Sequence, residues 1–216
     1  MQQIKGTHYI LMADIVGSSQ KGGAQLMEQF QQVVKSVNEQ YRNSLLSPLT
    51  ITLGDEYQGI ALSLEDSLKL LIAVEEGIVK QGAAFKLRHV LHQGPIDTPI
   101  NTEIAYEMLG AGLTRAREKL SELKNRKGER FWLETDSTRA NEQLNRLFLL
   151  YQSVLDDWSQ QEFTIVKAFW ELQDYKAVAE RLHKTPSLLW KRQRSLKLKE
   201  YLAVKELLFL SLPSSL

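Results

Sequence analysis

The sequence predicts an α+β protein in which a ferredoxin-like sheet domain, with a split βαβ order, precedes an all-α helix-turn-helix domain. Up to about residue 140, short apolar runs and helical patterns follow the order strand, helix, hairpin, helix, strand. From residue 141 onward the patterns are helical only. We therefore expect a sheet domain at 1–140, a helical connector at 141–160 and a helix-turn-helix domain at 161–216.

The expected elements of the sheet domain follow from local pattern. Apolar residues three and four apart identify helices, and short apolar runs identify strands. Gly54, Asp55 and Glu56 separate two such runs and predict a hairpin. Ser63 or Ser67 is placed to begin the second helix, and Gly82 is placed to end it. The elements are a strand at 8–15, a helix within 24–46, strands at 49–53 and 57–62, a helix at 63–82, a strand at 85–96, a helix at about 113–123 and a strand at 131–135.

Composition narrows the environment and the chemistry. The net charge of +1 excludes a global attraction to nucleic acid, so a basic surface must be local. Because cysteine is absent, disulfides, thiolate zinc sites and thiol nucleophiles are excluded, which fits a reducing compartment. The N-terminus lacks a signal-peptide pattern, and the apolar stretch at 207–212 is too short to span a bilayer. We expect a soluble, cytoplasmic protein with no membrane span.

An aspartate interrupts the first apolar run. Burying an unpaired carboxylate is costly, so Asp14 should have a partner or a cation. The surrounding ADIVGSS resembles the first strand of class III nucleotide cyclases, where an aspartate holds a catalytic magnesium. LGDEYQG resembles their hairpin, whose Gly-Asp supplies the second metal carboxylate, and also the matching hairpin of diguanylate cyclases. LRHVLHQGPI and LGAGLTRAREKL are similar to a later strand and helix, so the resemblance covers residues 8–135 in order.

This resemblance implies that Asp14 and Asp55 hold Mg²⁺ or Mn²⁺, in agreement with the preference of magnesium for carboxylate oxygens. The alternative is that Asp14 caps a turn and Asp55 suits a hairpin corner. If the two carboxylates converge without a cation, replacing either by asparagine should be neutral or stabilising by roughly 1 kcal/mol. Contacts to a phosphate or nucleotide are expected at Ile15, Gly17, Ser18, Ser19 and Glu56.

Departures from the cyclase pattern argue against cyclisation. Active cyclases carry an asparagine and an arginine on the helix after the late strand, where this chain has Thr114 and Glu118. A carboxylate cannot replace an arginine, and Arg115 or Arg117 would serve only if the register slipped. The residues that read the purine are also missing. We therefore expect ligand binding rather than nucleotide cyclisation at this site.

The C-terminal third predicts a helix-turn-helix within YKAVAERLHKTPSLLWKRQRSLK. Val178, Ala179 and Leu182 are the inward residues of its first helix, and Leu189 of the second helix is expected to pack on Ala179. His183 stands in the turn where glycine is common, and histidine tolerates the left-handed conformation. The connector carries an apolar face that must pack on the sheet domain, the helix-turn-helix or a second subunit. That face consists of Leu144, Leu147, Phe148, Tyr151 and Leu155.

Charge supports a nucleic-acid contact by this region. Residues 181–199 include seven basic side chains and no acidic one. Such a surface can neutralise phosphates while the second helix meets base edges. The alternative is a solvated helical hairpin used for protein contacts. DNA contacts are expected at Lys184, Lys191, Arg192, Arg194 and Lys197.

Together, a cyclase-like first domain and a C-terminal helix-turn-helix are similar to the SatD family of bacterial proteins over the whole chain. The resemblance implies a regulator more than an enzyme. Our leading hypothesis is a DNA-binding regulator whose cyclase-like domain binds a nucleotide or phosphate ligand through a divalent metal, without cyclase activity. A second hypothesis is a metal-dependent nucleotide cyclase or nucleotidyl transferase tethered to a DNA-binding module. The last amphipathic helix is expected to serve either internal packing or dimerisation, so a homodimer is among the expected partners.

Overall fold

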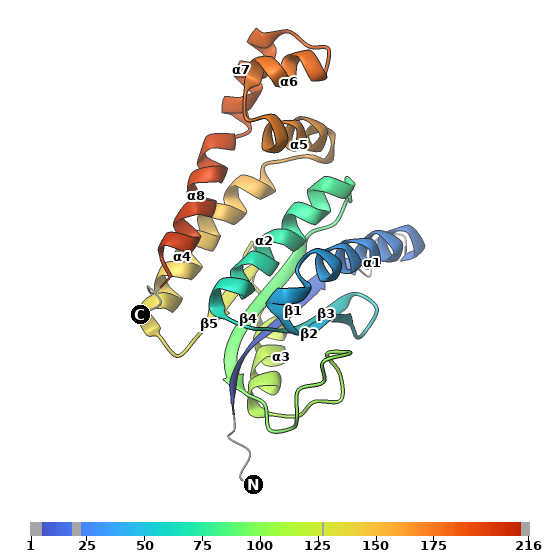
Figure 1. Cartoon of the computed structure of the whole chain (residues 1–216), viewed down its shortest axis with the longest axis vertical. Helices are drawn as coiled ribbons and strands as arrows, with labels where there is room; N and C mark the ends of the chain where they lie inside the picture. Colours follow the sequence, from blue (N-terminus) through green and yellow to red (C-terminus); the bar gives the residue numbers. More distant parts are fainter. Residues whose placement is uncertain (1–5, 19–22, 127, 213–216) are drawn as a thin grey trace.

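The computed structural model describes residues 6–18, 23–126 and 128–212, which form a five-stranded sheet covered by helices (Figure 1). Within these residues no helix is both long and apolar enough to span a membrane. The elements are β1 (Thr7–Ile15), α1 (Gly23–Gln40), η2 (Arg42–Ser44), β2 (Leu45–Ile51), β3 (Glu56–Ala61), α2 (Leu64–Gln81), β4 (Leu87–Pro95), α3 (Ala111–Lys124), β5 (Phe131–Glu134), α4 (Thr138–Asp156), η3 (Gln160–Glu162), α5 (Phe163–Leu172), α6 (Tyr175–Arg181), α7 (Pro186–Ser195) and α8 (Leu198–Leu210).

The sheet has the order β2-β3-β1-β4-β5. β1 lies between β3 and β4 and is antiparallel to both, and β5 adds to β4 in parallel. The mixed α+β class is confirmed, and the first four strands follow the predicted split βαβ order. β1 is buried along most of its length because it is the central strand and helices cover both of its faces.

Side chains of β1 point alternately to two apolar cores. Leu11, Ala13 and Ile15 pack with α1 and α2 on one face of the sheet. Ile10 and Met12 pack with α3 on the other face. The first two predicted helices therefore share a face, and the third covers the opposite one.

α2 begins and ends where its sequence predicts. The Ser63 hydroxyl accepts a hydrogen bond from the backbone N–H of Asp66 at 3.0 Å, which satisfies one free donor of the first turn. Gly82 follows the last turn in the left-handed conformation, with φ of 68°. The structure therefore selects Ser63 over Ser67 as the start of this helix and confirms Gly82 as its end.

α4, which contains most of the predicted connector, packs onto the sheet and α8. Phe148 stacks on Phe131 of β5 at 4.8 Å between ring centroids, and Tyr151 lies 5.6 Å from Tyr201 of α8. Apolar residues from β1 through α8 consequently belong to one continuous core. The apolar face of the connector thus packs on both the sheet and the C-terminal helices.

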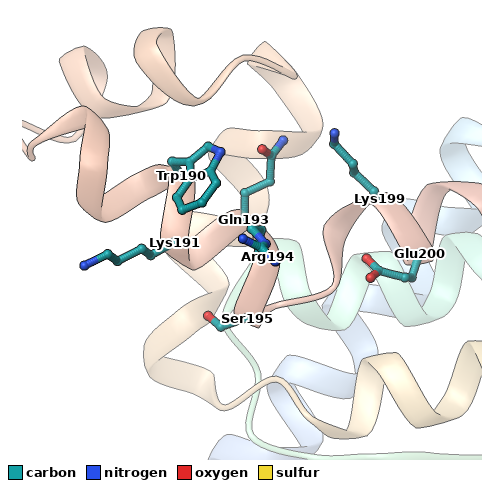
Figure 2. Close-up of a pocket in the computed structure, with 7 residues that line it drawn as sticks. All are labelled: Trp190, Lys191, Gln193, Arg194, Ser195, Lys199 and Glu200. Carbon is teal, nitrogen blue, oxygen red and sulfur yellow. The ribbon is translucent and has the colours of Figure 1, made fainter.

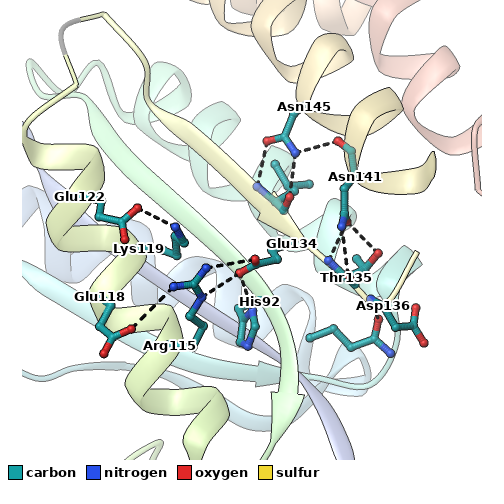
Figure 3. Close-up of polar contacts among 12 residues, drawn as sticks. His92, Arg115, Glu118, Lys119, Glu122, Glu134, Thr135, Asp136, Asn141 and Asn145 are labelled. Atoms are coloured by element: carbon teal, nitrogen blue, oxygen red, sulfur yellow. Dashed lines mark hydrogen bonds and ion pairs between the residues drawn. The ribbon is translucent and has the colours of Figure 1, made fainter. Parts of the chain in front are cut away.

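Asparagines from two helices bind the outer strands of the sheet. On β5, Asn145 of α4 donates to the carbonyl of Leu133 at 2.7 Å and accepts from its N–H at 3.0 Å (Figure 3). On β2, Asn38 of α1 makes the same two contacts with Leu49, both at 2.8 Å. Because an amide side chain has both a donor and an acceptor, each asparagine satisfies one residue of edge backbone.

A buried ion pair joins α2 to the start of β5. Glu75 and Arg130 are both about 5% exposed, and the guanidinium contacts the two carboxylate oxygens at 3.0 and 3.2 Å. His89 of β4 lies 2.7 Å from the same carboxylate, and Asp156 of α4 accepts from Arg130 at 3.1 Å. Burial alone would raise the pKa of Glu75, but Arg130 and His89 outweigh it and hold the pKa at about 2.

The next residue of α2 binds a different element. Glu76 accepts a hydrogen bond from the Tyr201 hydroxyl at 2.7 Å and pairs with Lys205, both on α8. Burial raises the pKa of Glu76, and the opposing contacts with Lys205 and Tyr201 bring it below its ordinary value. Glu75 and Glu76 therefore connect the sheet and α8 through one turn of α2.

We predict that Glu75→Gln destabilises the protein by roughly 3 kcal/mol at pH 7, because Arg130 loses a buried charge partner. The free energy of unfolding, measured in urea, should show this. The ordinary pKa of 4.5 falls to about 2 on folding, so the stabilisation is present above pH 4.5 and is lost as the pH falls toward 2.

The deficit of the Glu75→Gln protein relative to wild type should therefore shrink over that pH range. Glu142→Gln, on an exposed i,i+4 pair of α4, is the matched control and should change the free energy of unfolding little. A deficit for Glu75→Gln as small as that of the control would contradict the role of the ion pair.

Candidate functional site

Asp14 lies near the end of β1 and is 1% exposed. Arg88 is its direct cross-strand partner in β4. The guanidinium binds the carboxylate with two contacts, Nε to Oδ1 and Nη2 to Oδ2, each at 2.9 Å. A bidentate pair of this kind is among the strongest charge-assisted contacts of proteins, so the buried aspartate has a partner within the chain.

A second cation stands over the same carboxylate. Lys124, at the end of α3, places its ammonium 3.3 Å from Asp14 and 2.9 Å from Glu56. Glu56 of β3 is the other cross-strand neighbour of Asp14. Burial lowers the pKa of Lys124, but the two carboxylates outweigh it and raise the pKa above its ordinary value. The Asp14 cluster, comprising Glu56, Asp14, Arg88 and Lys124, therefore crosses three strands with its charges balanced.

The predicted phosphate loop begins at the same end of the sheet. The Asp55 carbonyl accepts from the N–H of Ile15 at 3.0 Å, and its carboxylate accepts from the Ser18 hydroxyl at 2.5 Å. Gly17 has φ of 70°, a conformation that favours glycine. Ser19 lies outside the described residues. The structure thus brings Asp14, Asp55 and the described loop residues to one end of β1.

The fit to a metal ion is poor in this arrangement. Within residues 6–18, 23–126 and 128–212, no three histidines or acids are grouped so as to hold a metal ion. Both oxygens of Asp14 bind Arg88, and Asp55 binds Ser18. A divalent cation at Asp14 would have to displace a cationic side chain. The metal and phosphate roles of these residues stay predictions.

Arg88 and Lys124 were not among the predicted site residues. A signal for Arg88 was available, because it interrupts an apolar strand as Asp14 does and has the opposite charge. No local pattern distinguishes Lys124 from Lys119, the other lysine of this helix. Arg115, the nearby candidate for the missing cyclase arginine, is engaged by Glu134 at 3.3 Å (Figure 3).

A second candidate site is formed by α6, α7 and the start of α8. Asp174 caps α6 and Thr185 caps α7, and the segment between the two helices is short. Ala179 and Leu189 are buried where the two helices pack together. His183 has φ of 51°, which confirms the predicted left-handed conformation in the turn. Short helices joined by a tight turn leave one side of α7 exposed to solvent.

The basic side chains of this region fall into two groups. Arg192 pairs with Glu162, and Lys197 contacts Asp157 at 2.6 Å. In the described part of the chain, Lys184, Lys191 and Arg194 have no acidic partner and are exposed. The predicted basic face is thus partly neutralised by acids that precede α5.

An exposed aromatic residue accompanies the unpaired cations. The Arg194 guanidinium lies 5.0 Å from the ring centroid of Trp190, which is 44% exposed. Sequence reasoning missed Trp190, although an aromatic residue among lysines and arginines was a signal for it. The groove at this surface is lined by Trp190, Lys191, Gln193, Arg194, Ser195, Lys199 and Glu200 (Figure 2).

A protein-family model described as the SatD family matches residues 9–208. The chain belongs to the SatD family. The resemblance predicted from the sequence is therefore confirmed. A search of curated protein sequences found no match for this SatD-family protein.

Solved structures similar to this SatD-family protein include nucleotide cyclase domains. The catalytic core of a rhodopsin-guanylyl cyclase with converted specificity has a TM-score of 0.41 and 15% identity, covering 53% of this chain and 71% of that chain. The guanylate cyclase domain of RhGC from Catenaria anguillulae has a TM-score of 0.41 and 14% identity, covering 54% and 73%. A bacterial light-regulated adenylyl cyclase has a TM-score of 0.42 and 11% identity, covering 59% and 74%.

Two unpartnered carboxylates would make the replacement of Asp14 by asparagine neutral or stabilising. Because Asp14 is paired with Arg88 and Lys124, we now expect this replacement to be destabilising. We predict that Asp14→Asn lowers the free energy of unfolding by about 2 to 4 kcal/mol, because Arg88 loses its anion in a largely buried position. Asp55→Asn keeps an acceptor for Ser18 and should cost less than about 1 kcal/mol. Urea unfolding of both variants measures the difference.

Asp14→Asn combined with Arg88→Met is the test of the pair itself. The double variant should lose less free energy of unfolding than the two single variants lose together, because neither buried charge is left without its partner. If Asp14→Asn alone were neutral or stabilising, the ion pair with Arg88 would not explain why Asp14 is buried.

Proposed function

We propose that this SatD-family protein is a DNA-binding regulator that contacts duplex DNA through α7. The observation that carries the proposal is the exposed side of α7, where Lys191 and Arg194 lack acidic partners in the described part of the chain. α6 and α7, joined by the turn at His183, have the element order of a helix-turn-helix. In that motif the second helix enters the major groove and the first crosses the backbone.

The ion pairs refine the set of expected DNA contacts. Arg192 and Lys197 are held by acids of the same chain, so their charges contribute less to the field that DNA meets. Lys184, Lys191 and Arg194 remain available, and Lys199 at the start of α8 lines the same groove. We therefore assign the main phosphate contacts to these four residues.

Apolar side chains on α7 support a contact with bases or sugars. Leu188 and Trp190 are each 44% exposed, beside the unpaired cations. Exposed apolar groups among positive charges fit an interface that meets both phosphate and the less polar base edges. A helical hairpin that only faced water would gain nothing from exposing them.

The competing hypothesis is a metal-dependent nucleotide cyclase or nucleotidyl transferase. It requires a cation at Asp14 and Asp55, whereas Arg88 and Lys124 bind Asp14. We therefore rank catalysis second. Incubation with nucleoside triphosphates and Mg²⁺ or Mn²⁺, followed by product analysis, separates it from binding without turnover.

We predict that Lys191→Ala with Arg194→Ala weakens binding to duplex DNA and lowers the log-log salt slope by about 2, since each lost phosphate contact removes about 0.9. Fluorescence anisotropy of a labelled random-sequence duplex over a range of KCl concentrations measures this slope. Far-ultraviolet circular dichroism should show unchanged helix content, because exposed charges contribute little to stability.

Arg192→Ala with Lys197→Ala is the matched control, since it removes the same formal charge from the same region. Its slope should change less, because Glu162 and Asp157 already neutralise these cations. Equal slopes for the wild type and the Lys191 and Arg194 variant, or no binding at low salt, would contradict the assignment of α7.

A further inference from the structure

A cavity of about 290 Å³ lies where the sheet meets the C-terminal helices. The residues that line it come from the end of α2, the segment before β4, the end of α4 and the start of α5. We call it the junction cavity. Most of its surface is apolar and is contributed by Ile78, Val79, Phe85, Leu155, Trp158 and Phe163.

One wall of the junction cavity is charged, and most of its charged groups already bind other groups of the protein. Arg130 binds Glu75, Asp156 and the carbonyl of Leu87, which together occupy every nitrogen of its guanidinium. This wall therefore offers a ligand few free donors.

Lys86 and Gln160, both in the lining, keep hydrogen-bonding capacity for a ligand. The Lys86 ammonium lies 2.8 Å from Asp156, its side chain is 48% exposed, and it has three donors. Gln160 donates its amide N–H to the carbonyl of Gly82 at 2.6 Å, which leaves the amide oxygen. The Lys86 ammonium is the stronger hydrogen-bonding group of the two because it is charged.

We propose that the junction cavity binds a small amphipathic acid, with a ring-sized apolar body inside and a carboxylate on Lys86. Cavities of about 150 Å³ lined by apolar residues hold benzene, and pockets for larger ligands begin near 300 Å³. The volume therefore suits one ring with a short acidic arm. A carboxylate gains a charge-assisted hydrogen bond from Lys86, and the neighbouring Asp156 carboxylate is already neutralised by Arg130.

A ligand at this position contacts a residue that also holds the C-terminal helices. The indole N–H of Trp158 donates to the carbonyl of Leu196 at 2.8 Å, between α7 and α8. Lys197, the next residue, is left-handed with φ of 51° and marks the bend between these helices. An occupant packed on the Trp158 ring therefore lies one side chain away from this bend.

The test uses phenylacetate and its neutral analogue 2-phenylethanol with the full chain. Methyl resonances of Ile78, Val79 and Leu155 should shift on addition of either probe, and those of Leu62, an exposed residue that follows β3, should not. No shift of the three cavity methyls with either probe at millimolar concentration overturns the proposal. Shifts spread over exposed methyls as strongly as over the cavity also overturn it.

Lys86→Met tests the acidic head while the apolar cavity is kept. It should weaken phenylacetate binding roughly tenfold and leave 2-phenylethanol unchanged, because only the acid uses the ammonium. Lys35→Met, which removes an exposed lysine of α1, is the charge control and should change neither affinity. Equal effects of Lys86→Met on both probes, or none on either, overturn the assignment of a carboxylate to Lys86.

Discussion

Glu75 and Arg130 form the ion pair on which the arrangement of the two halves of the molecule depends. Arg130 also binds Asp156 of α4 and the backbone of β4, so three elements converge on one guanidinium. Glu76, the next residue of α2, holds Tyr201 and Lys205 of α8. Moving the C-terminal helices away from the sheet would break these contacts and expose buried charge, so the ion pair limits how freely the two halves move.

Features determined by neighbours in the chain were predictable. The helices follow from apolar spacing, and the ends of α2 follow from Ser63 and Gly82, because a cap needs only its own helix. The left-handed His183 is equally local, since the turn between two short helices imposes it. The order of the first four strands followed from the succession of elements, because few topologies accommodate it, whereas the place of β5 beside β4 was not predicted.

Features that depend on partners distant in the sequence were not predictable. Asp14 and Arg88 are 74 residues apart, and only the register of β1 against β4 brings them together. Without that register, the need of a buried carboxylate for a cation is met equally well by magnesium or by an arginine. The same holds for Arg192, whose pairing with Glu162 separates it from Arg194 although both lie on one basic helix.

The asparagines that bind the two edge strands of the sheet have a consequence for self-association. Asn38 and Asn145 occupy backbone groups of β2 and β5 that a strand of another molecule would need for pairing. β2 also contains Pro48, which has no N–H, and its register with β3 is irregular. Both edges of the sheet are thus poor templates for added strands. Two copies that associate in solution would accordingly meet through helical surfaces.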